Sequence, residues 1–249
     1  MVRHPWSLPV IHNEEFERAH VIDQLAVCFT DFDRMQCIRT THILSIVALS
    51  VWAAMVSYGV ASLLIYDSKP GQAASAPSSF PDAPEEEESR GRPLMLVFLH
   101  PHCPCSRATL DQLEAILVSN KQEFACRVLI VVPSQAEPGW ENGPLIERVE
   151  KIAGISIERD FGGTAAKRFA AATSGQVLFY DNDRSLAFSG GITSSRGHSG
   201  ENVGANAILT LLKKKLAPST MAPVYGCPLF NLETFQLETS CGEGSQCKK

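Results

Sequence analysis

The residues best suited to chemistry lie in one short segment, residues 100–107, which reads HPHCPCSR. Its two cysteines, Cys103 and Cys105, follow an apolar run and open a segment with helical spacing. A thiol at a helix N-terminus faces unpaired backbone N–H groups and the positive end of the helix dipole, so its thiolate is stabilised. Arg107 in the first turn acts in the same direction. A second thiol within reach completes a two-electron couple, so the segment predicts a thiol–disulfide active site.

The histidines of this segment have different expected roles. His102 adjoins the cysteine pair and is the candidate proton acceptor during exchange. His100 ends the apolar run, where a place in the core explains a histidine equally well. Two orders of attack stay open, because Cys103 has the usual position of a nucleophile, whereas Cys105 lies nearer to the helix N–H groups.

A second hypothesis is that the same segment binds a metal ion, because thiolates and imidazoles are ligands for Cu(I) and Zn(II). A third is an inert disulfide or a non-enzymatic adaptor. The redox hypothesis implies no organic cofactor. The candidate metal ligands are His100, His102, Cys103 and Cys105, with Cys227 or His198 added if folding brings them close.

A polar, glycine-rich loop at 190–202 is a further candidate for the site. Loops before a helix often line a site. Arg196 and His198 would bind an anion there or complete the cleft, while Asn202 fits a capping role for the helix that follows.

The other cysteines outside the N-terminal region differ in their surroundings. Cys126 falls in an apolar run and fits a small core residue. Cys241 and Cys247 lie in the C-terminal tail and would pair with each other outside the cytoplasm. Cys227 is an auxiliary candidate for the site, and its pairing with the Cys-Pro-Cys segment stays open.

Short apolar runs alternate with helical spacing over residues 93–218. Strands that alternate with helices imply parallel pairing, and a closing hairpin adds antiparallel strands to the same sheet. The prediction is an α/β domain with a central mixed sheet flanked by helices. The expected strands are 93–100, 124–133, 155–159, 176–180 and 186–189, and the expected helices are 105–119, 144–153, 160–172 and 203–216.

This arrangement resembles the thioredoxin-like superfamily. The resemblance rests on the strand-Cys-Pro-Cys-helix pattern, on DFGG at 160–163 before a helix, and on the last helix after VLFYDNDRSLAFSGG. Within the superfamily the chain is most similar to membrane-anchored bacterial proteins called RedB, through HPHCPCSRATL, SGGITSSRGHSGENVG and VYGCPLF. The resemblance covers roughly residues 93–230 and implies a thioredoxin-like fold with thiol–disulfide chemistry.

The sequence departs from thioredoxins in two places. Thioredoxins carry Cys-x-x-Cys, whereas only Pro104 separates the cysteines here, so a disulfide closed over it is strained and oxidising. Thioredoxins also have a cis-proline before the fourth strand, and the matching stretch, ATSGQ at 172–176, has no proline. The resemblance alone therefore does not imply that an extended substrate peptide binds against this loop, as it does in thioredoxins.

An apolar segment precedes this domain. Ile43–Tyr66 has no charged residue and reaches roughly 36 Å as a helix, enough to cross a bilayer. We interpret residues 42–66 as a signal anchor, because the run is longer than the apolar part of a cleaved signal peptide. Arg34 and Arg39 before it outnumber Lys69 shortly after it, which predicts a cytoplasmic N-terminus.

The remaining divisions follow from composition. Residues 1–41 form a cytoplasmic segment without an assigned function, and a start at Met35 stays an alternative. Residues 67–92 are rich in Pro, Ala, Ser and Glu, which predicts an extended linker. The domain occupies 93–218, and 219–249 forms an irregular tail that contains cysteines.

The 249 residues carry a formal net charge of −5, which gives no general attraction to nucleic acid. We expect a single-pass protein of the inner (cytoplasmic) membrane, held in the lipid bilayer by residues 43–66, with its domain outside the cytoplasm. Its expected activity is thiol–disulfide exchange with envelope proteins that carry cysteine thiols or disulfides.

Overall fold

The computed structural model describes residues 14–81, 91–120, 123–217 and 219–230, and for residues 14–38 the backbone alone. The chain divides into two compact units, one ending at Leu63 and the other beginning at Leu64. The predicted pairing of Cys241 with Cys247 lies outside the described residues.

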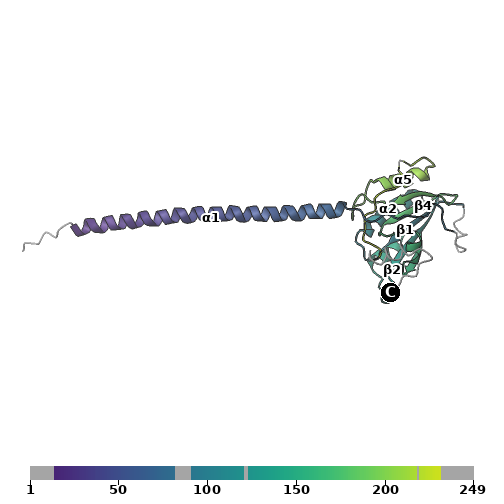
Figure 1. Cartoon of the computed structure of the whole chain (residues 1–249), viewed down its shortest axis with the longest axis horizontal. Coiled ribbons are helices and arrows are strands. Elements are labelled where there is room, and N and C mark those ends of the chain that lie inside the picture. The colour runs from purple at the N-terminus through teal and green to yellow at the C-terminus, as the bar shows by residue number, and fades with distance from the viewer. Residues whose placement is uncertain (1–13, 82–90, 121–122, 218, 231–249) are drawn as a thin grey trace, which may run out of the picture. The chain divides into compact units, whose positions relative to one another are not determined.

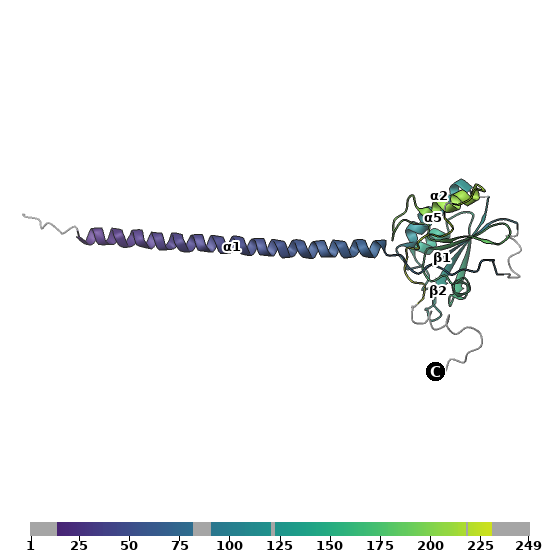
Figure 2. The ribbon, with the colours of Figure 1, turned by 45° about the horizontal axis from the view of Figure 1, so that its top comes forward.

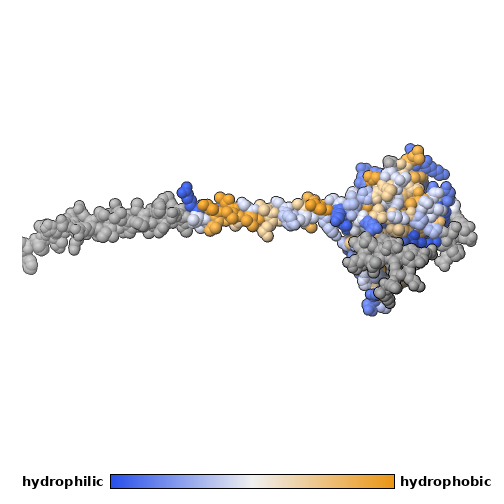
Figure 3. Space-filling model, in the orientation of Figure 1, coloured by the Kyte–Doolittle hydropathy of each residue, from blue (hydrophilic) through white to orange (hydrophobic). Residues whose placement is uncertain are grey.

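A long helix makes up the described part of the first unit and the start of the second. The helix α1 extends over Glu14–Ser68, and its part Arg39–Ser68 is long and apolar enough to cross a membrane, with a mean hydropathy of 2.0. Figure 3 shows hydrophobic side chains along the part Arg39–Ser68. The Ser50 hydroxyl donates to the Ile46 carbonyl at 2.8 Å, so this polar group is satisfied without water. The expected span, 42–66, lies inside this helix.

The second unit is built on a mixed sheet of five strands. They are β1 (Leu94–Leu99), β2 (Ala125–Val132), β3 (Ser156–Phe161), β4 (Gln176–Tyr180) and β5 (Leu186–Gly190). β1 pairs with β2 in parallel and with β4 antiparallel. β3 extends the sheet in parallel beyond β2, and β5 extends it antiparallel beyond β4. The order is therefore β3-β2-β1-β4-β5 (Figure 1), which confirms the predicted mixed sheet.

Helices cover both faces of this sheet. They are α2 (Ser106–Asn120), α3 (Pro144–Val149), α4 (Thr164–Arg168) and α5 (Val203–Leu212). The helices α2, α3 and α5 pack on one face, where Figure 2 shows α2 beside α5, and α4 packs on the other. Along β1, Met95 and Val97 belong to the first core, while Leu96 and Phe98 belong to the second. An unbroken apolar run is therefore buried on both sides, as in other central strands.

The helix expected at 160–172 is shorter in the structure because β3 continues to Phe161. Gly163 adopts a left-handed conformation, with φ of 66°, and α4 begins after it. The Asp160 carboxylate accepts the backbone N–H groups of Ala165 and Ala166 at 2.9 and 2.8 Å. These two bonds satisfy donors that the first turn of a helix leaves unpaired.

The segment expected as an extended linker, 67–92, differs from that expectation over its described part, because it packs on the domain. Ala74 is buried, and only 7% of Phe80 is exposed. The Phe80 ring lies 5.4 Å from the ring of Phe169 and 5.2 Å from that of Tyr180, measured between centroids. A few apolar residues in a polar stretch thus complete the core on the α4 face of the sheet.

We expect Phe80→Ala to lower the free energy of unfolding by about 3 kcal/mol, because the lost ring leaves a cavity between two aromatic neighbours. Chemical denaturation of the full chain in detergent measures the change. Val118→Ala is the control, since Val118 is 84% exposed and its loss should change stability by less than about 0.5 kcal/mol. Equal losses in the two variants would contradict a packing role for the segment.

Candidate active site

Cys103 and Cys105 lie where β1 leads into α2. Backbone hydrogen bonds shape the turn between these elements: the Cys103 N–H donates to the His100 carbonyl at 3.0 Å, and the Ser106 N–H donates to the Cys103 carbonyl at 3.1 Å. The exposed fraction is 2% for Cys103 and 8% for Cys105. The pair is therefore buried at the N-terminus of a helix, where the helix dipole favours a thiolate.

A third cysteine reaches this pair from the described start of the predicted tail. The backbone N–H of Cys227 donates to the sulfur of Cys103 at 3.3 Å, and the Cys227 thiol donates to the same sulfur. The Cys105 thiol also donates to Cys103. Cys103 is therefore the centre of a three-cysteine cluster formed by Cys103, Cys105 and Cys227.

A segment of the same chain pairs with the loop 172–176, and this pairing holds Cys227 in place. The Ser174 N–H donates to the Cys227 carbonyl at 2.8 Å, and the Leu229 N–H donates to the Ala172 carbonyl at 2.8 Å. In thioredoxins an extended substrate peptide lies against the matching loop. Here the Ala172 carbonyl and the Ser174 N–H of that loop are already paired within the chain.

The hydrogen bonds of the cluster lower the pKa of Cys103. Burial by itself raises this pKa, but hydrogen bonds from the thiol and backbone of Cys227 and from the side chain and backbone of Ser106 outweigh it. A thiolate that accepts several hydrogen bonds is stabilised relative to the thiol. Of the two orders of attack, this geometry favours Cys103 as the thiolate.

The other two thiols of the cluster remain protonated at neutral pH. Burial and the neighbouring Cys103 charge raise the pKa of Cys105. Burial, the bond to Cys103 and its charge raise the pKa of Cys227 to about 12. The guanidinium of Arg196 acts against both shifts. One thiolate thus lies between two thiol donors, with one cation nearby.

Arg196 comes from the polar loop and lies beside the cluster, where it hydrogen-bonds Cys105. The guanidinium donates to the Gly226 carbonyl at 2.5 Å and lies 4.8 Å from the centroid of the Tyr66 ring. The backbone N–H of Arg196 donates to the Asp67 carbonyl at 3.2 Å. These contacts fix the positive charge next to the residue that precedes Cys227.

His198, the other candidate of this loop, has different partners. Its Nδ1 lies 2.9 Å from the Ser195 hydroxyl and 3.4 Å from a carboxylate oxygen of Asp67. Among the described residues, no hydrogen bond joins it to a thiol of the cluster. The loop therefore brings Arg196, and not His198, to the cysteines.

The two histidines of the motif form an aromatic group with Trp140. The His102 Nε2 lies 2.7 Å from the Trp140 carbonyl oxygen, and the two rings are 4.5 Å apart between centroids. The His102 N–H donates to His100 Nδ1 at 3.2 Å. Burial, followed by the charge of His102, lowers the pKa of His100. In the described part of the chain no hydrogen bond joins either ring to a thiol, and the ring of the expected proton acceptor, His102, contacts Trp140.

Two further expectations concern Arg107 and the metal ligands. Arg107 is exposed on the first turn of α2. Within the residues that the structure describes, no group of three or more His, Cys, Asp or Glu side chains is placed to hold a metal ion. The four candidate ligands of residues 100–105 are divided between the cysteine cluster and the Trp140 group.

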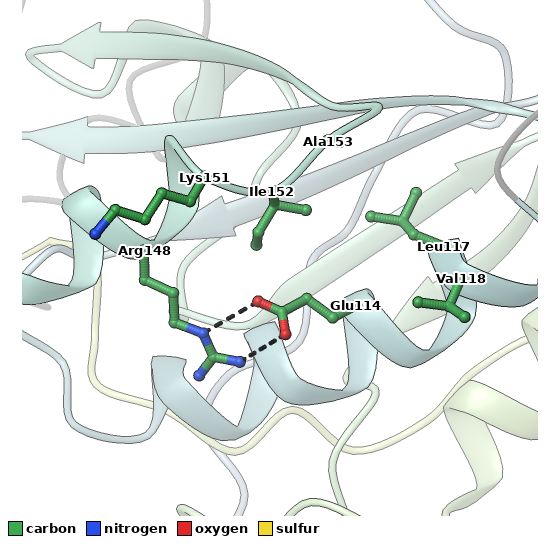
Figure 4. Close-up of a pocket in the computed structure, with 7 residues that line it drawn as sticks. All are labelled: Glu114, Leu117, Val118, Arg148, Lys151, Ile152 and Ala153. Atoms are coloured by element: carbon green, nitrogen blue, oxygen red, sulfur yellow. Dashed lines mark hydrogen bonds and ion pairs between the residues drawn. The ribbon is translucent and has the colours of Figure 1, made fainter.

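A surface hollow of about 390 Å³ lies elsewhere, between α2 and α3. Figure 4 shows Glu114 and Arg148 facing each other across it, with bonds of 3.1 and 2.9 Å between guanidinium and carboxylate. None of its lining residues belongs to the cysteine cluster. This hollow is a contact between two helices and adds nothing to the site.

Two serines complete the site, and neither was singled out from the sequence. The hydroxyls of Ser106 and Ser174 are 2.9 Å apart, and the His100 N–H donates to the Ser174 hydroxyl at 2.8 Å. Ser106 follows Cys105 at the first position of α2, and this position next to the motif could have indicated that it belongs to the site. Ser174 has no local signal, because only folding brings it to the motif.

We expect Ser106→Ala to raise the pKa of Cys103, because the thiolate loses a side-chain donor. At neutral pH the rate of Cys103 alkylation should fall by up to roughly tenfold, the scale of one hydrogen bond to a charged group. Following the rate with iodoacetamide from pH 5 to pH 9, with mass mapping, measures the shift. Ser194→Ala, on the exposed part of the polar loop, is the control. An unchanged profile in Ser106→Ala would remove this serine from the site.

A sheet of order β3-β2-β1-β4-β5, with three parallel strands, an antiparallel hairpin and a cysteine pair at the start of α2, defines a thioredoxin-like fold. No protein-family model matches the chain, and no curated protein matches it. Solved structures do, and they include recognised thioredoxin-like proteins. The resemblance to RedB is not tested by these matches.

Three of these solved structures illustrate the likeness. A hypothetical protein from Sinorhizobium meliloti is 23% identical, with a TM-score of 0.49, over 66% of this chain and 96% of that one. An uncharacterized conserved protein from Geobacillus kaustophilus is 18% identical, with a TM-score of 0.49, over 67% and 93%. The exposed lipoprotein thioredoxin Etrx1 from Streptococcus pneumoniae is 16% identical, with a TM-score of 0.39, over 51% and 87%.

Proposed function

We propose that this chain is a membrane-anchored thiol–disulfide oxidoreductase whose reactive group is the Cys103 thiolate. The observation that carries the proposal is the position of the Cys103 sulfur, which is buried just before the N-terminus of α2 and accepts the Cys227 N–H at 3.3 Å. Its hydrogen bonds from Cys227 and Ser106 lower the pKa of Cys103. A thiolate is the form that attacks disulfides, and a low pKa also makes it a good leaving group. A second thiol beside it completes a couple that stores two electrons.

The chemistry proceeds by exchange of sulfur partners. A thiolate of the cluster attacks one sulfur of a partner disulfide, a mixed disulfide forms, and the electron pair of the broken bond leaves on the other partner sulfur. A second thiol of the cluster then attacks the cluster sulfur of the mixed disulfide, and the first partner sulfur leaves and takes up the proton. The partner gains two electrons, and the chain holds a disulfide. The reverse sequence oxidises a partner.

The anchor supports a place in the cell envelope. Arg39–Ser68 is long and apolar enough to span a bilayer, and Arg34 and Arg39 give the N-terminal side its excess of positive charge. We therefore place the N-terminus in the cytoplasm and the thioredoxin-like domain outside it, where disulfides persist. The partners are envelope proteins with cysteine thiols or disulfides.

The test is a redox titration of the full chain in detergent micelles. The protein is equilibrated without oxygen at several ratios of reduced to oxidised glutathione, quenched with acid and mapped by mass spectrometry. We expect a reversible disulfide that includes Cys103. Cys126→Ala is the matched control, because Cys126 is 4% exposed, burial raises its pKa to about 12, and its loss should leave the titration unchanged. No reversible disulfide at any ratio, or stoichiometric copper or zinc that protects Cys103, would overturn the proposal.

A further inference from the structure

We propose that Cys227, and not Cys105, is the redox partner of Cys103, and that the Cys227 sulfur is the one that exchanges with partner thiols. This inference rests on the proposed function and names the pair of sulfurs that performs it. It assigns a catalytic role to a cysteine that lies more than a hundred residues from the Cys-Pro-Cys motif, at a separation of 124.

The segment that carries Cys227 is anchored on both sides. Before it, the Ala222 N–H donates to the Ser189 carbonyl at 3.3 Å, at the end of β5. After it, the Leu229 N–H donates to the Ala172 carbonyl at 2.8 Å. Cys227 therefore occupies a fixed position over Cys103 instead of approaching it from a free tail.

Gly226 makes this close position possible. A Cβ at Gly226 would collide with the backbone carbonyl of Ser174. The absence of a side chain lets this segment come close enough for the Cys227 N–H to reach the Cys103 sulfur at 3.3 Å. The backbone N–H and the thiol of Cys227 therefore both contact the Cys103 sulfur, which is the atom that would bond to Cys227 in a disulfide.

Cys105 is the competing partner, since its thiol also contacts Cys103. However, a disulfide between the two would close a short ring over Pro104 alone, whose fixed φ restricts the geometry of that ring. The turn is also held by hydrogen bonds from Ser106 to the Cys103 carbonyl and from Ala108 to the Cys105 carbonyl, each of 3.1 Å. Cys227 belongs to a separate segment, so bonding to it leaves this turn intact.

Exposure and acidity distinguish the two sulfurs of the inferred disulfide. Only 2% of Cys103 is exposed, whereas Cys227 is partly exposed. An incoming thiolate therefore attacks the Cys227 sulfur, the bond to Cys103 breaks, and its electron pair stays on Cys103. The thiol with the lower pKa is the better leaving group. Of the two sulfurs, Cys103 has the lowered pKa and Cys227 the raised one.

The exchange balances as a two-electron reaction. After the attack, Cys227 and the partner share a mixed disulfide and Cys103 is a thiolate. The second thiolate of the partner then attacks the first partner sulfur, and Cys227 leaves and takes up a proton. The partner dithiol becomes a disulfide, and Cys103 and Cys227 are reduced. The cation of Arg196, which lowers the pKa of Cys227, favours this departure.

The first experiment maps the disulfide of the full chain in detergent after oxidation by glutathione disulfide. We expect a Cys103–Cys227 cross-link in the wild type and in Cys105→Ser. In Cys227→Ser and Cys227→Ala, the equilibrium constant for disulfide formation at Cys103 should fall by about tenfold or more. A Cys103–Cys105 disulfide in the wild type, formed equally well without Cys227, would overturn the inference. A wild type that forms no reversible disulfide would instead overturn the proposed function.

A second experiment identifies the attacked sulfur without any substitution. Oxidised wild-type chain is treated briefly with reduced glutathione, and excess N-ethylmaleimide is then added to capture the thiols that have been released. We expect glutathione on Cys227 and maleimide on Cys103. The opposite labelling would show attack at Cys103 and overturn that part of the inference. Thermal melting of both Cys227 variants in parallel verifies that they are folded.

Discussion

Cys103→Ser is expected to abolish thiol–disulfide exchange and to lower its rate to background, a loss of at least about a hundredfold. The reason is that Cys103 is the one member of the cluster whose pKa is lowered, while those of Cys105 and Cys227 are raised. Without it the remaining thiols are protonated at neutral pH and react slowly. Reduction of a small disulfide by the full chain in detergent measures the rate.

The control for this substitution is Cys126→Ala, which removes a buried thiol from the core and should leave the rate within about twofold. The pH profile provides an independent check. A thiol is reactive above its pKa, so lowering the pKa of Cys103 keeps the wild type active at pH values below the ordinary thiol range. In Cys103→Ser any residual activity should appear only at alkaline pH. Activity retained at neutral pH would assign the chemistry to another residue.

The sheet could be predicted because the signals for it are local. The unbroken apolar run of β1 is buried on both faces, and hydrophobic spacing in α2 matches the positions that pack on the sheet, such as Leu110 and Leu113. The motif at 100–107 lies between these two elements, so its place at a helix N-terminus followed directly from the sequence. Patterns that depend on neighbouring residues were sufficient for this part of the molecule.

The packing of 67–92 could not be predicted in the same way. Its average composition is typical of a spacer, and only a few residues determine the outcome. Phe80 finds an aromatic pocket formed by Phe169 and Tyr180, and Tyr180 also donates from its hydroxyl to the Pro77 carbonyl at 3.1 Å. Such contacts depend on where distant strands place their side chains, and composition contains no information about that.

The candidate site shows the same division between local and distant signals. Arg196 and His198 are neighbours in one loop, yet the first lies beside the thiols and the second bonds Asp67. His102 adjoins Cys103 in sequence but turns toward Trp140. Cys227 reaches the cluster through backbone pairing at Ser174. In each case the direction of a side chain is decided by tertiary contacts, which spacing alone does not determine.

Gly226→Ala is expected to separate Cys227 from Cys103 and to lower the free energy of unfolding by about 2 kcal/mol. The added Cβ would meet the Ser174 carbonyl, which is backbone and has no other rotamer to adopt, so the segment itself must move. Its movement breaks the bond between the Ser174 N–H and the Cys227 carbonyl and withdraws the Cys227 N–H from the Cys103 sulfur. The pKa of Cys103 should rise, because the thiolate loses two of its donors.

Two measurements follow these effects: the pH midpoint of thiolate absorbance near 240 nm, which should move upward, and the yield of the Cys103–Cys227 disulfide, which should fall by about tenfold. Gly59→Ala is the matched control, because a Cβ at Gly59 would meet nothing within 4 Å. An unchanged midpoint and yield in Gly226→Ala would mean that the chain tolerates a side chain at this position without moving Cys227. The low pKa of Cys103 would then depend on Ser106 and the helix N-terminus alone, and the thiolate would be a property of the motif instead of the three-cysteine cluster.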